Sequence, residues 1–315
     1  MPDRQNLRPK IMVTGAAGAL AKAIILKLSA KYRVIAVDFR KQVEFPPPII
    51  SQKADFNKRL FEDIFRDHVI DGVIHLGRIQ ANEANRFSRY NANVIGTQKL
   101  FDLSKKYNVK QVLVLSTYFV YGAHPFNPSL LDEKTPLKAA ELTMDLVDSV
   151  ELENLANIYL YKYPELNITI LRPCNIAGPG VKNTFSTLLS QKQAQVLWGF
   201  SPLMQFIHID DMRDAICLAF EKNIPGLYNV APDDYIAFQK AVEESGCTKM
   251  QIPSVPPILA EQISRMMKWK SFPVHLINYF KYPVIIDGSL FEKTFGFKPK
   301  KSLSDIFKYY RSLKR

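Results

Sequence analysis

The sequence predicts an α/β fold, in which a doubly wound parallel sheet is joined to a smaller C-terminal lobe. Short apolar runs alternate with longer segments of helical spacing through the first half of the chain, as in repeated βαβ units. A glycine-rich turn follows the first of these runs. After Cys174 the alternation loosens, and turn signals divide the chain into smaller pieces. Together these observations indicate one sheet domain that carries a less regular lobe.

Six apolar runs are the predicted strands of the sheet: 11–14, 33–37, 49–50, 73–76, 112–115 and 168–171. Helical spacing follows the first run over 20–28, and a helical stretch over 87–107 separates the fourth run from the fifth. The second run ends at Asp38, a proline cluster at 46–48 precedes the third, and Pro173 ends the sixth. Connections of this length fit a single doubly wound sheet.

Turn signals predict where the smaller lobe lies along the chain. Glycine or proline residues recur at 178–180, at 225–226 and over 253–257. We expect the sheet domain to comprise residues 1–173, to which 206–231 return, and the lobe to comprise 174–205 and 232–315.

The composition is that of an ordinary globular protein, with 47% hydrophobic and 23% charged residues. The apolar runs stay below the roughly 18 residues that a membrane span needs, and the polar segment 1–10 leads directly into a strand. Cys174, Cys217 and Cys247 lack the spacing of metal ligands. We therefore expect a cytoplasmic protein with reduced thiols and no metal site.

The net charge of +12 is large and raises the question of an anionic partner. The basic residues are spread along the chain, with some crowding over 268–315, and no nucleic-acid-binding motif accompanies them. A stretch that mixes aromatic side chains with lysines, 266–282, is typical of a lobe core, although it also fits an apolar ligand or a membrane surface. We expect a solvated basic surface, and the sequence gives no strong evidence for nucleic acid or a membrane as a partner.

The turn after the first strand has the features of a diphosphate-binding loop. Gly15 permits a tight turn, Gly18 lets the backbone approach a diphosphate, and Ala21 allows the helix to pack closely on the strand. The N-terminal N–H groups of the helix and its positive dipole end point toward bound phosphates. The residues expected to line the diphosphate are Gly15, Ala17, Gly18, Ala19 and Leu20.

Asp38, at the end of the second strand, indicates which dinucleotide binds. A carboxylate in this place can accept hydrogen bonds from the adenosine ribose, and it repels a 2′-phosphate. NAD is therefore the expected cofactor, whereas the nearby Arg40 leaves NADP open.

Further motifs extend this pattern over almost the whole chain. They are Asp55-Phe56, VIHLG at 73–77, NVIGT at 93–97, LSTYFVYG at 115–122, LRPCNIAGP at 171–179, FIHIDD at 206–211, YNVA at 228–231 and the segment 287–299. Their order and spacing resemble those of the extended short-chain dehydrogenases/reductases, in the NAD-dependent epimerase/dehydratase branch. The resemblance implies a Rossmann-like sheet, a C-terminal substrate lobe, oxidoreductase-like chemistry and NAD lying across the strand ends.

The resemblance also implies how the cofactor is held. Besides the glycine turn and Asp38, the expected contacts are Asp55, Phe56, Leu76, Gly77, Arg78 and Asn93. Asp55 and Phe56 would flank the adenine, and Thr117 would sit beside the nicotinamide. His75 and His208 are expected to be structural, because each lies in or beside a strand pattern. A homodimer through two helices is also implied.

Proton transfer in such proteins depends on a tyrosine four residues before a lysine. The lysine ammonium and the cofactor's positive charge lower the pKa of the phenol, while a hydroxyl, here that of Thr117, holds the substrate oxygen. The pair is expected on the helix before the sixth strand, over 141–161. Between Ala139 and Ile158 the chain has neither a tyrosine nor a lysine. The sequence therefore predicts that the catalytic pair is missing.

Asp145 and Ser149 take the two positions in the preferred alignment, because 148–153 resembles the acidic end of the family motif. A shift of two residues places Thr143 and Val147 there instead. Neither alignment provides a phenolate.

Carboxylates crowd the same predicted helix, at Glu141, Asp145, Asp148, Glu151 and Glu153. A carboxylate beside a nicotinamide stabilises the oxidised, positively charged ring and disfavours NADH. If Asp145 or Asp148 faces the nicotinamide, we expect NAD⁺ to bind more tightly than NADH.

Tyr118, Tyr121 and His124 follow the fifth strand and are candidates for a replacement base, as is Asp145. Tyr121 belongs to a motif whose tyrosine is usually packed. Two functions stay open: an inactive or weakly active NAD-binding protein with a binding or regulatory role, and an active epimerase, dehydratase or dehydrogenase that uses one of these groups on a sugar or other non-standard substrate. A nucleic-acid-binding regulator is a weaker third.

The segment before Phe206 bears on the ligand. Family members that bind nucleotide sugars carry an arginine there that grips the diphosphate, whereas 201–205 contain none. Asn183 and Arg213 are candidate phosphate contacts. The case for a nucleotide sugar is weakened, and we expect a small-molecule ligand of unknown identity.

Overall fold

The computed structural model describes residues 8–56, 58–79, 85–254 and 274–314. The chain forms two compact units. Unit 1 comprises Met1–Thr117, Val147–Arg172 and Arg213–Tyr228, and unit 2 comprises Tyr118–Leu146, Pro173–Met212 and Asn229–Arg315. The domain boundaries predicted from the sequence stay a prediction. Residues 266–273 of the aromatic and lysine-rich stretch lie outside the described residues.

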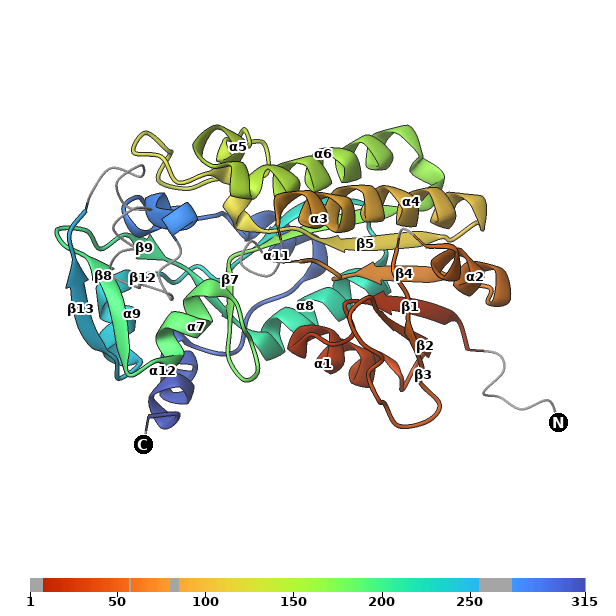
Figure 1. The fold of residues 1–315 in the computed structure, drawn as a ribbon, viewed down its shortest axis with the longest axis horizontal. Helices are drawn as coiled ribbons and strands as arrows, with labels where there is room; N and C mark the ends of the chain where they lie inside the picture. The colour runs from red at the N-terminus through yellow and green to blue at the C-terminus, as the bar shows by residue number, and fades with distance from the viewer. Residues whose placement is uncertain (1–7, 57, 80–84, 255–273, 315) are drawn as a thin grey trace. The chain divides into compact units, whose positions relative to one another are not determined.

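A seven-stranded sheet forms the core of unit 1, in the strand order β11-β6-β5-β4-β1-β2-β3 (Figure 1). Its strands are β1 (Lys10–Thr14), β2 (Arg33–Asp38), β3 (Ile50–Lys53), β4 (Gly72–His75), β5 (Gln111–Leu115), β6 (Ile168–Pro173) and β11 (Gly226–Val230). The neighbouring strands from β3 to β6 pair in parallel. The predicted α/β class with a doubly wound parallel sheet is confirmed.

The strand order reverses beside β1, because the chain first builds outward to β3 and then returns to place β4 on the other side. The carboxyl ends of β2, β1, β4 and β5 therefore meet along one edge of the sheet. Ligands of open α/β sheets bind at this edge, next to the point of reversal. The predicted cofactor residues lie at or after the carboxyl ends of β1, β2, β3 and β4, or on the helical segments that follow β1 and β4.

Helices cover both faces of the sheet, so the strands are buried along most of their length. The helical elements of unit 1 are α1 (Ala19–Leu28), α2 (Arg59–Asp67), α3 (Arg86–Tyr90), the π-helix η2 (Asn91–Ile95), α4 (Gly96–Lys106), α6 (Val147–Lys162), the 3₁₀ turn η5 (Pro164–Leu166) and most of α8 (Ile209–Lys222). In Figure 1, α4 and α6 run side by side, and the rings of Phe101 and Tyr159 stack between them with centroids 4.7 Å apart. This contact fixes α6 against α4.

The helix predicted over 141–161 is broken into α5 (Ala139–Leu142), the 3₁₀ turn η4 (Met144–Leu146) and α6. The break is at Thr143, whose backbone is extended (φ −157°, ψ 135°) and whose Oγ1 accepts the Asp145 N–H at 3.2 Å. A threonine hydroxyl that bonds to nearby backbone competes with helical hydrogen bonding. The expectation that Asp145 and Ser149 lie on one helix is therefore wrong: Asp145 belongs to η4 in unit 2, and Ser149 to α6 in unit 1.

Unit 2 is built from short elements. They are η3 (Tyr118–Tyr121), α5, η4, β7 (Asn175–Ala177), α7 (Thr184–Ser190), β8 (Gln193–Leu197), β9 (Leu203–Met204), β10 (Phe206–His208), β12 (Ile236–Ala237), α9 (Phe238–Glu244), β13 (Thr248–Ile252), η6 (Val274–Phe280), α11 (Ser289–Phe295) and α12 (Leu303–Ser312). Its strands form three two-stranded sheets, β10-β7, β12-β9 and β13-β8. In the described ranges, none of the helices is long and apolar enough to cross a membrane.

Candidate functional site

The turn between β1 and α1 is built around Gly15. Its φ is +72°, in the left-handed region that favours glycine, and a Cβ there would lie 2.8 Å from the backbone nitrogen of Gly77. The Gly18 N–H donates to the Gly15 carbonyl at 2.9 Å, and Gly18 begins α1 without a side-chain cap. The other predicted lining residues are half-buried: Ala17, Ala19 and Leu20. Bare backbone and an uncapped helix start suit a diphosphate.

Asp38 lies beside this turn at the end of β2. Its buried carboxylate accepts the Ala17 N–H at 3.0 Å and the Arg40 N–H at 2.9 Å, so it fixes the turn in place. A carboxylate oxygen accepts more than one hydrogen bond, so these contacts leave it suited to ribose hydroxyls as well. The Arg40 Nε lies 3.8 Å from the same carboxylate on a partly exposed side chain.

Phe56 supports the turn from within the core. Its ring packs edge-on against Phe61 at 5.0 Å and against His75 at 5.6 Å between centroids. A Cβ at Gly77 would lie 3.0 Å from the Phe56 ring, so the backbone after β4 rests on it. Asp55 is half-buried beside it. The adenine contact predicted for Asp55 and Phe56 stays a prediction.

His75 belongs to a directed chain of hydrogen bonds. The Thr97 hydroxyl donates to the Asn93 carbonyl at 2.5 Å, so it accepts from His75 Nε2 at 2.9 Å. With its proton on Nε2, His75 accepts the Thr14 hydroxyl at Nδ1, at 2.7 Å. Thr14 Oγ1 in turn accepts the backbone N–H groups of Leu76 and Gly77. Burial lowers the pKa of His75 to about 4, so the ring is neutral and braces the turn after β4.

Arg78 follows that turn and reaches the start of α6. Its guanidinium donates to the Ser149 hydroxyl, although the two residues are 71 positions apart. Arg78 is half-buried and Ser149 is buried. Burial lowers the pKa of Arg78, and the nearby Asp148 carboxylate opposes that shift. The structure thus places a cation against Ser149, one of the two positions at which the sequence predicts the missing pair.

Asp148 is enclosed by partners. Its carboxylate accepts the Asn93 side-chain amide at 2.5 Å and lies 3.4 Å from the Arg89 Nε, and the side chains of Asp148 and Arg89 are 4% and 3% exposed. Asn93 also binds the backbone of Ile79 through both amide atoms. An arginine thus offsets the charge of Asp148, and its position relative to the nicotinamide stays a prediction. Asn93 braces this cluster, and its cofactor contact stays a prediction.

Glu153 and Arg172 form a buried pair that the sequence reasoning missed. Arg172 Nε donates to Glu153 at 2.7 Å, and the Ser116 hydroxyl donates to the other carboxylate oxygen. The pair ties α6 to the ends of β5 and β6, next to the half-buried Thr117. The sequence signal for this pair was two opposite charges, each inside an apolar segment. That they pair with each other depends on the strand order, which the spacing does not give.

Comparison with known proteins identifies the family. The model of the NAD dependent epimerase/dehydratase family matches residues 11–231. The chain belongs to the NAD-dependent epimerase/dehydratase family. It is 24% identical over 321 residues to an uncharacterized protein of Mycobacterium tuberculosis, covering 96% of this chain and 83% of the relative. It is 25% identical to UDP-glucose 4-epimerase 3 of Oryza sativa, covering 70% and 69%.

Solved structures share the fold of this epimerase/dehydratase family member. The UDP-glucuronic acid 4-epimerase of Bacillus cereus, in complex with UDP-glucuronic acid and NAD, is 24% identical with a TM-score of 0.74, covering 97% of this chain and 99% of that one. The dTDP-glucose 4,6-dehydratase of Bacillus anthracis, in complex with NAD, is 18% identical with a TM-score of 0.75, covering 96% and 97%. The NAD in both agrees with the predicted cofactor.

Two of the predicted replacement bases are buried in unit 2 of this family member. The Tyr118 hydroxyl donates to Asn175 Oδ1 at 2.9 Å, and burial raises the pKa of Tyr118 well above its usual value. The Tyr121 hydroxyl lies 2.8 Å from both the Asp132 carbonyl and Asn229 Oδ1. Tyr118 therefore stays a protonated phenol near neutral pH, and Tyr121 is held in the packing.

His124 and Asp145 are the more accessible candidates. Both are half-buried. His124 Nδ1 accepts the Phe126 N–H at 3.2 Å, and its ring lies 5.4 Å from that of Phe126. Both residues belong to unit 2 and stay candidates there.

The residues expected to contact a phosphate have structural partners. Asn183 caps α7, where its Oδ1 accepts the Ser186 N–H at 2.8 Å. Arg213 Nε lies 2.7 Å from an Asp214 carboxylate oxygen. Gln205, just before Phe206, is buried and donates to two backbone carbonyls. The position before Phe206 therefore supports the fold of unit 2.

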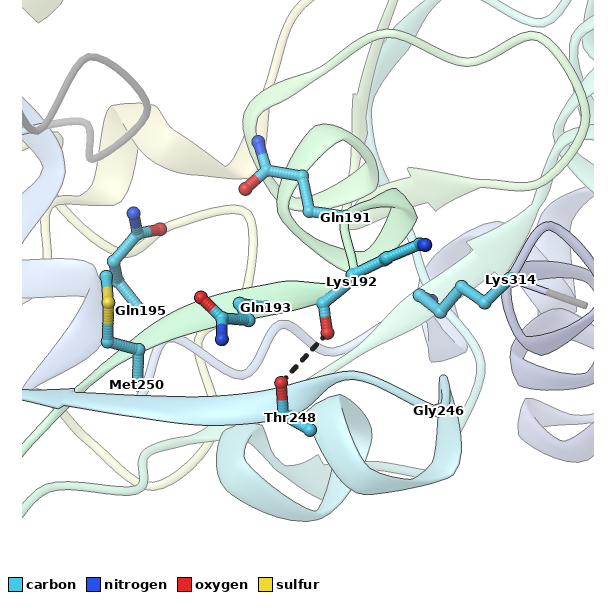
Figure 2. Close-up of a pocket in the computed structure, with 8 residues that line it drawn as sticks. All are labelled: Gln191, Lys192, Gln193, Gln195, Gly246, Thr248, Met250 and Lys314. Carbon is cyan, nitrogen blue, oxygen red and sulfur yellow. Dashed lines mark hydrogen bonds between the residues drawn. The ribbon is translucent and has the colours of Figure 1, made fainter.

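Unit 2 also contains a pocket that the sequence did not indicate. It measures about 670 Å³ and is lined by Gln191, Lys192, Gln193, Gln195, Gly246, Thr248, Met250 and Lys314. Figure 2 shows Gln193 and Gln195 on β8 and Gln191 just before it, with Lys314 at the opposite end of the pocket from Gln195. The Lys314 ammonium donates to the carbonyls of Leu189 and Ser245, both at 2.6 Å. This amide-rich lining suits hydrogen bonding to a polar ligand more than proton transfer.

Proposed function

We propose that this chain binds NAD through unit 1 and has a binding or regulatory role, being inactive or weakly active in the proton-transfer chemistry of its family. The observation that carries the proposal is the segment between Ala139 and Ile158, which contains neither tyrosine nor lysine. When bound, NAD supplies a hydride acceptor. The segment 139–158 offers no phenolate to take the accompanying proton.

The geometry of unit 1 supports NAD as the ligand. Gly15 keeps side-chain atoms out of the turn, and the uncapped start of α1 suits the diphosphate. Asp38 offers acceptors to the ribose and repels a 2′-phosphate, which favours NAD over NADP. The description of the family also names NAD.

A second candidate function is an active epimerase, dehydratase or other oxidoreductase with a substitute base. The observation that favours it is the partial exposure of His124 and Asp145, in contrast to the buried Tyr118 and Tyr121. Thr117, half-buried at the end of β5, supplies the hydroxyl for a substrate oxygen. The substrate would be a sugar nucleotide or another small molecule whose phosphate does not need an arginine before Phe206.

Two measurements separate these candidates. Calorimetry with NAD⁺ and NADP⁺ measures binding, and we expect NAD⁺ to bind and an Asp38→Ala variant to lose that preference. Epimerisation and dehydration of UDP-glucose, UDP-glucuronic acid and dTDP-glucose are then followed with NAD present. We expect no turnover. Turnover that His124→Gln or Asp145→Asn abolishes would establish the second candidate instead.

We also propose a homodimer in the cytoplasm. The solvent face of α6 exposes Ile158 by 56% and Tyr161 by 83%, and Ile95 just before α4 is 41% exposed. Exposed apolar side chains on two neighbouring helices suit a two-helix interface. Burial raises the pKa of Cys174 and Cys217, as for unreactive reduced thiols. Sedimentation of the wild type and of an Ile158→Lys variant tests the interface, since the charge should leave only monomer.

A further inference from the structure

The order of the strands lays out the dinucleotide site from end to end. Asp38 ends β2, Gly15 follows β1, Gly77 follows β4 and Thr117 follows β5, and these strands are neighbours in that order. Their carboxyl ends share one edge. If the adenosine ribose lies at Asp38 and the diphosphate at Gly15, the nicotinamide half of the dinucleotide lies at the ends of β4 and β5.

Arg78 is fixed at that part of the edge. It follows β4, and its guanidinium donates to the Ser149 hydroxyl at the start of α6. One helical turn later, Glu153 accepts the hydroxyl of Ser116, the residue before Thr117. The same helix therefore holds both the guanidinium and the end of β5.

The described charges of this cluster are three arginines, including Arg78, and two carboxylates, so they leave one cation in excess. Among the described residues of this cluster, Asp148 lies 3.4 Å from the Arg89 Nε, and Glu153 is bound by Arg172. Each carboxylate is thus matched by an arginine other than Arg78. A guanidinium carries five N–H donors, and the Ser149 hydroxyl accepts from one of its nitrogens. Arg78 is half-buried, so its charge is only partly screened by water.

We propose that Arg78 is the positioning cation of the nicotinamide half of the NAD site, where it donates to the ribose hydroxyls and makes the site prefer NADH to NAD⁺. The proposal rests on the proposed NAD binding. The oxidised nicotinamide ring carries a positive charge, which a nearby guanidinium repels, whereas the reduced ring is neutral. A guanidinium held beside the ring therefore favours the neutral reduced form, and we expect it to change the affinity ratio on the order of tenfold.

Calorimetry on the full chain with NAD⁺, NADH and ADP-ribose tests the proposal. We expect the wild type to bind NADH about tenfold more tightly than NAD⁺. Arg78→Met, which keeps the length of the side chain but removes its charge, should bring the ratio close to one. Arg78→Lys should keep the preference for NADH. ADP-ribose, which lacks the nicotinamide ring, reports changes in the rest of the site.

Arg40→Met is the matched control, because it removes one positive charge at the adenosine end. It should change the affinities for NAD⁺ and NADH by the same factor. Thermal unfolding reports whether each variant is folded. If Arg78→Met does not fold, Ser149→Ala replaces it, because it removes the hydroxyl that holds the guanidinium. This variant should lower the preference for NADH over NAD⁺.

The proposal is overturned if the wild type binds NAD⁺ more tightly than NADH. It is also overturned if neither Arg78→Met nor Ser149→Ala changes the ratio of the two affinities. Both results leave NAD binding itself intact. If the wild type binds no dinucleotide, the proposed function is wrong, and so is the proposed role of Arg78.

Discussion

His75 is held between Thr14 and Thr97 by hydrogen bonds whose directions leave no place for a second ring proton. Thr97 has already given its proton to a backbone carbonyl, and Thr14 gives its own to His75 Nδ1. A charged imidazole would have to turn Thr14 around, away from its role as donor. His75 therefore acts as a brace for the turn after β4.

The hydrogen bonds around His75 predict that the stability of the protein depends on pH. The folded state holds His75 neutral with a pKa of about 4, whereas the unfolded chain titrates near 6.5. Between these values the unfolded state binds a proton that the folded state does not, so the free energy of unfolding falls as the pH drops from 6.5 to 4. The full difference is about 3 kcal/mol.

Urea unfolding at several pH values measures this dependence. The His75→Gln variant should be less stable at neutral pH but should lose much of the slope between pH 6.5 and 4, whereas His124→Gln, outside the chain of hydrogen bonds, should keep it. A slope unchanged by His75→Gln would contradict the assignment.

Gly15 offers a second test at the scale of one residue. In Gly15→Ala the new Cβ meets the backbone of Gly77 at 2.8 Å, in addition to the strain of a φ of +72°. Gly199 has a φ of +78° with open space around it, so Gly199→Ala carries the strain alone. We expect about 1 kcal/mol of destabilisation at Gly199 and more at Gly15, together with lost NAD binding at Gly15 only. Thermal unfolding measures the stability of both variants, and calorimetry measures their NAD binding. Equal losses of stability in the two variants would contradict a clash between the new Cβ and the Gly77 backbone.

At the scale of the element, buried ion pairs that the sequence did not reveal join α6 to helix α3 and to strand β6. Asp148 faces Arg89, and Glu153 faces Arg172, so the buried side of the helix is a set of ion pairs. Its remaining carboxylate, Glu151, is exposed. The helix can therefore lie over the site without giving it a negative charge.

Removing one partner of the deeper pair should destabilise the fold strongly. Glu153→Gln leaves the Arg172 guanidinium buried without its carboxylate, and we expect a loss of about 3–5 kcal/mol. Glu151→Gln removes the same charge from the exposed face of α6 and should change stability by less than about 0.5 kcal/mol. Denaturant unfolding compares the two, and similar small effects would show that the pair does not anchor α6.

For the whole molecule, the sequence was sufficient to predict the sheet and the glycine turn. The strands carry continuous apolar runs because helices cover both faces, and Gly15 and Asp38 stand at fixed places after the first two strands. β11 was not among the predicted strands, because Gly226 and Asn229 interrupt its apolar residues. The short strands of unit 2 carry too few residues for a period to be recognised.

The side-chain partners were beyond sequence reasoning for a different reason. Arg78 and Ser149 meet only because the strand order places the end of β4 under the start of α6. The break at Thr143, which separates Asp145 from that helix, depends on one local hydrogen bond. Neither the contact between Arg78 and Ser149 nor the break at Thr143 can be predicted from residue spacing along the chain.

The most direct test of the account is product formation from nucleotide sugars followed by NMR, with a chain shown by calorimetry to hold NAD. The account predicts saturable NAD binding and no epimerised or dehydrated sugar above the rate without protein. Rapid multiple turnover would contradict it. Turnover that His124→Gln or Asp145→Asn abolishes would establish the substitute-base candidate, and turnover that survives both would assign the proton transfer to another group.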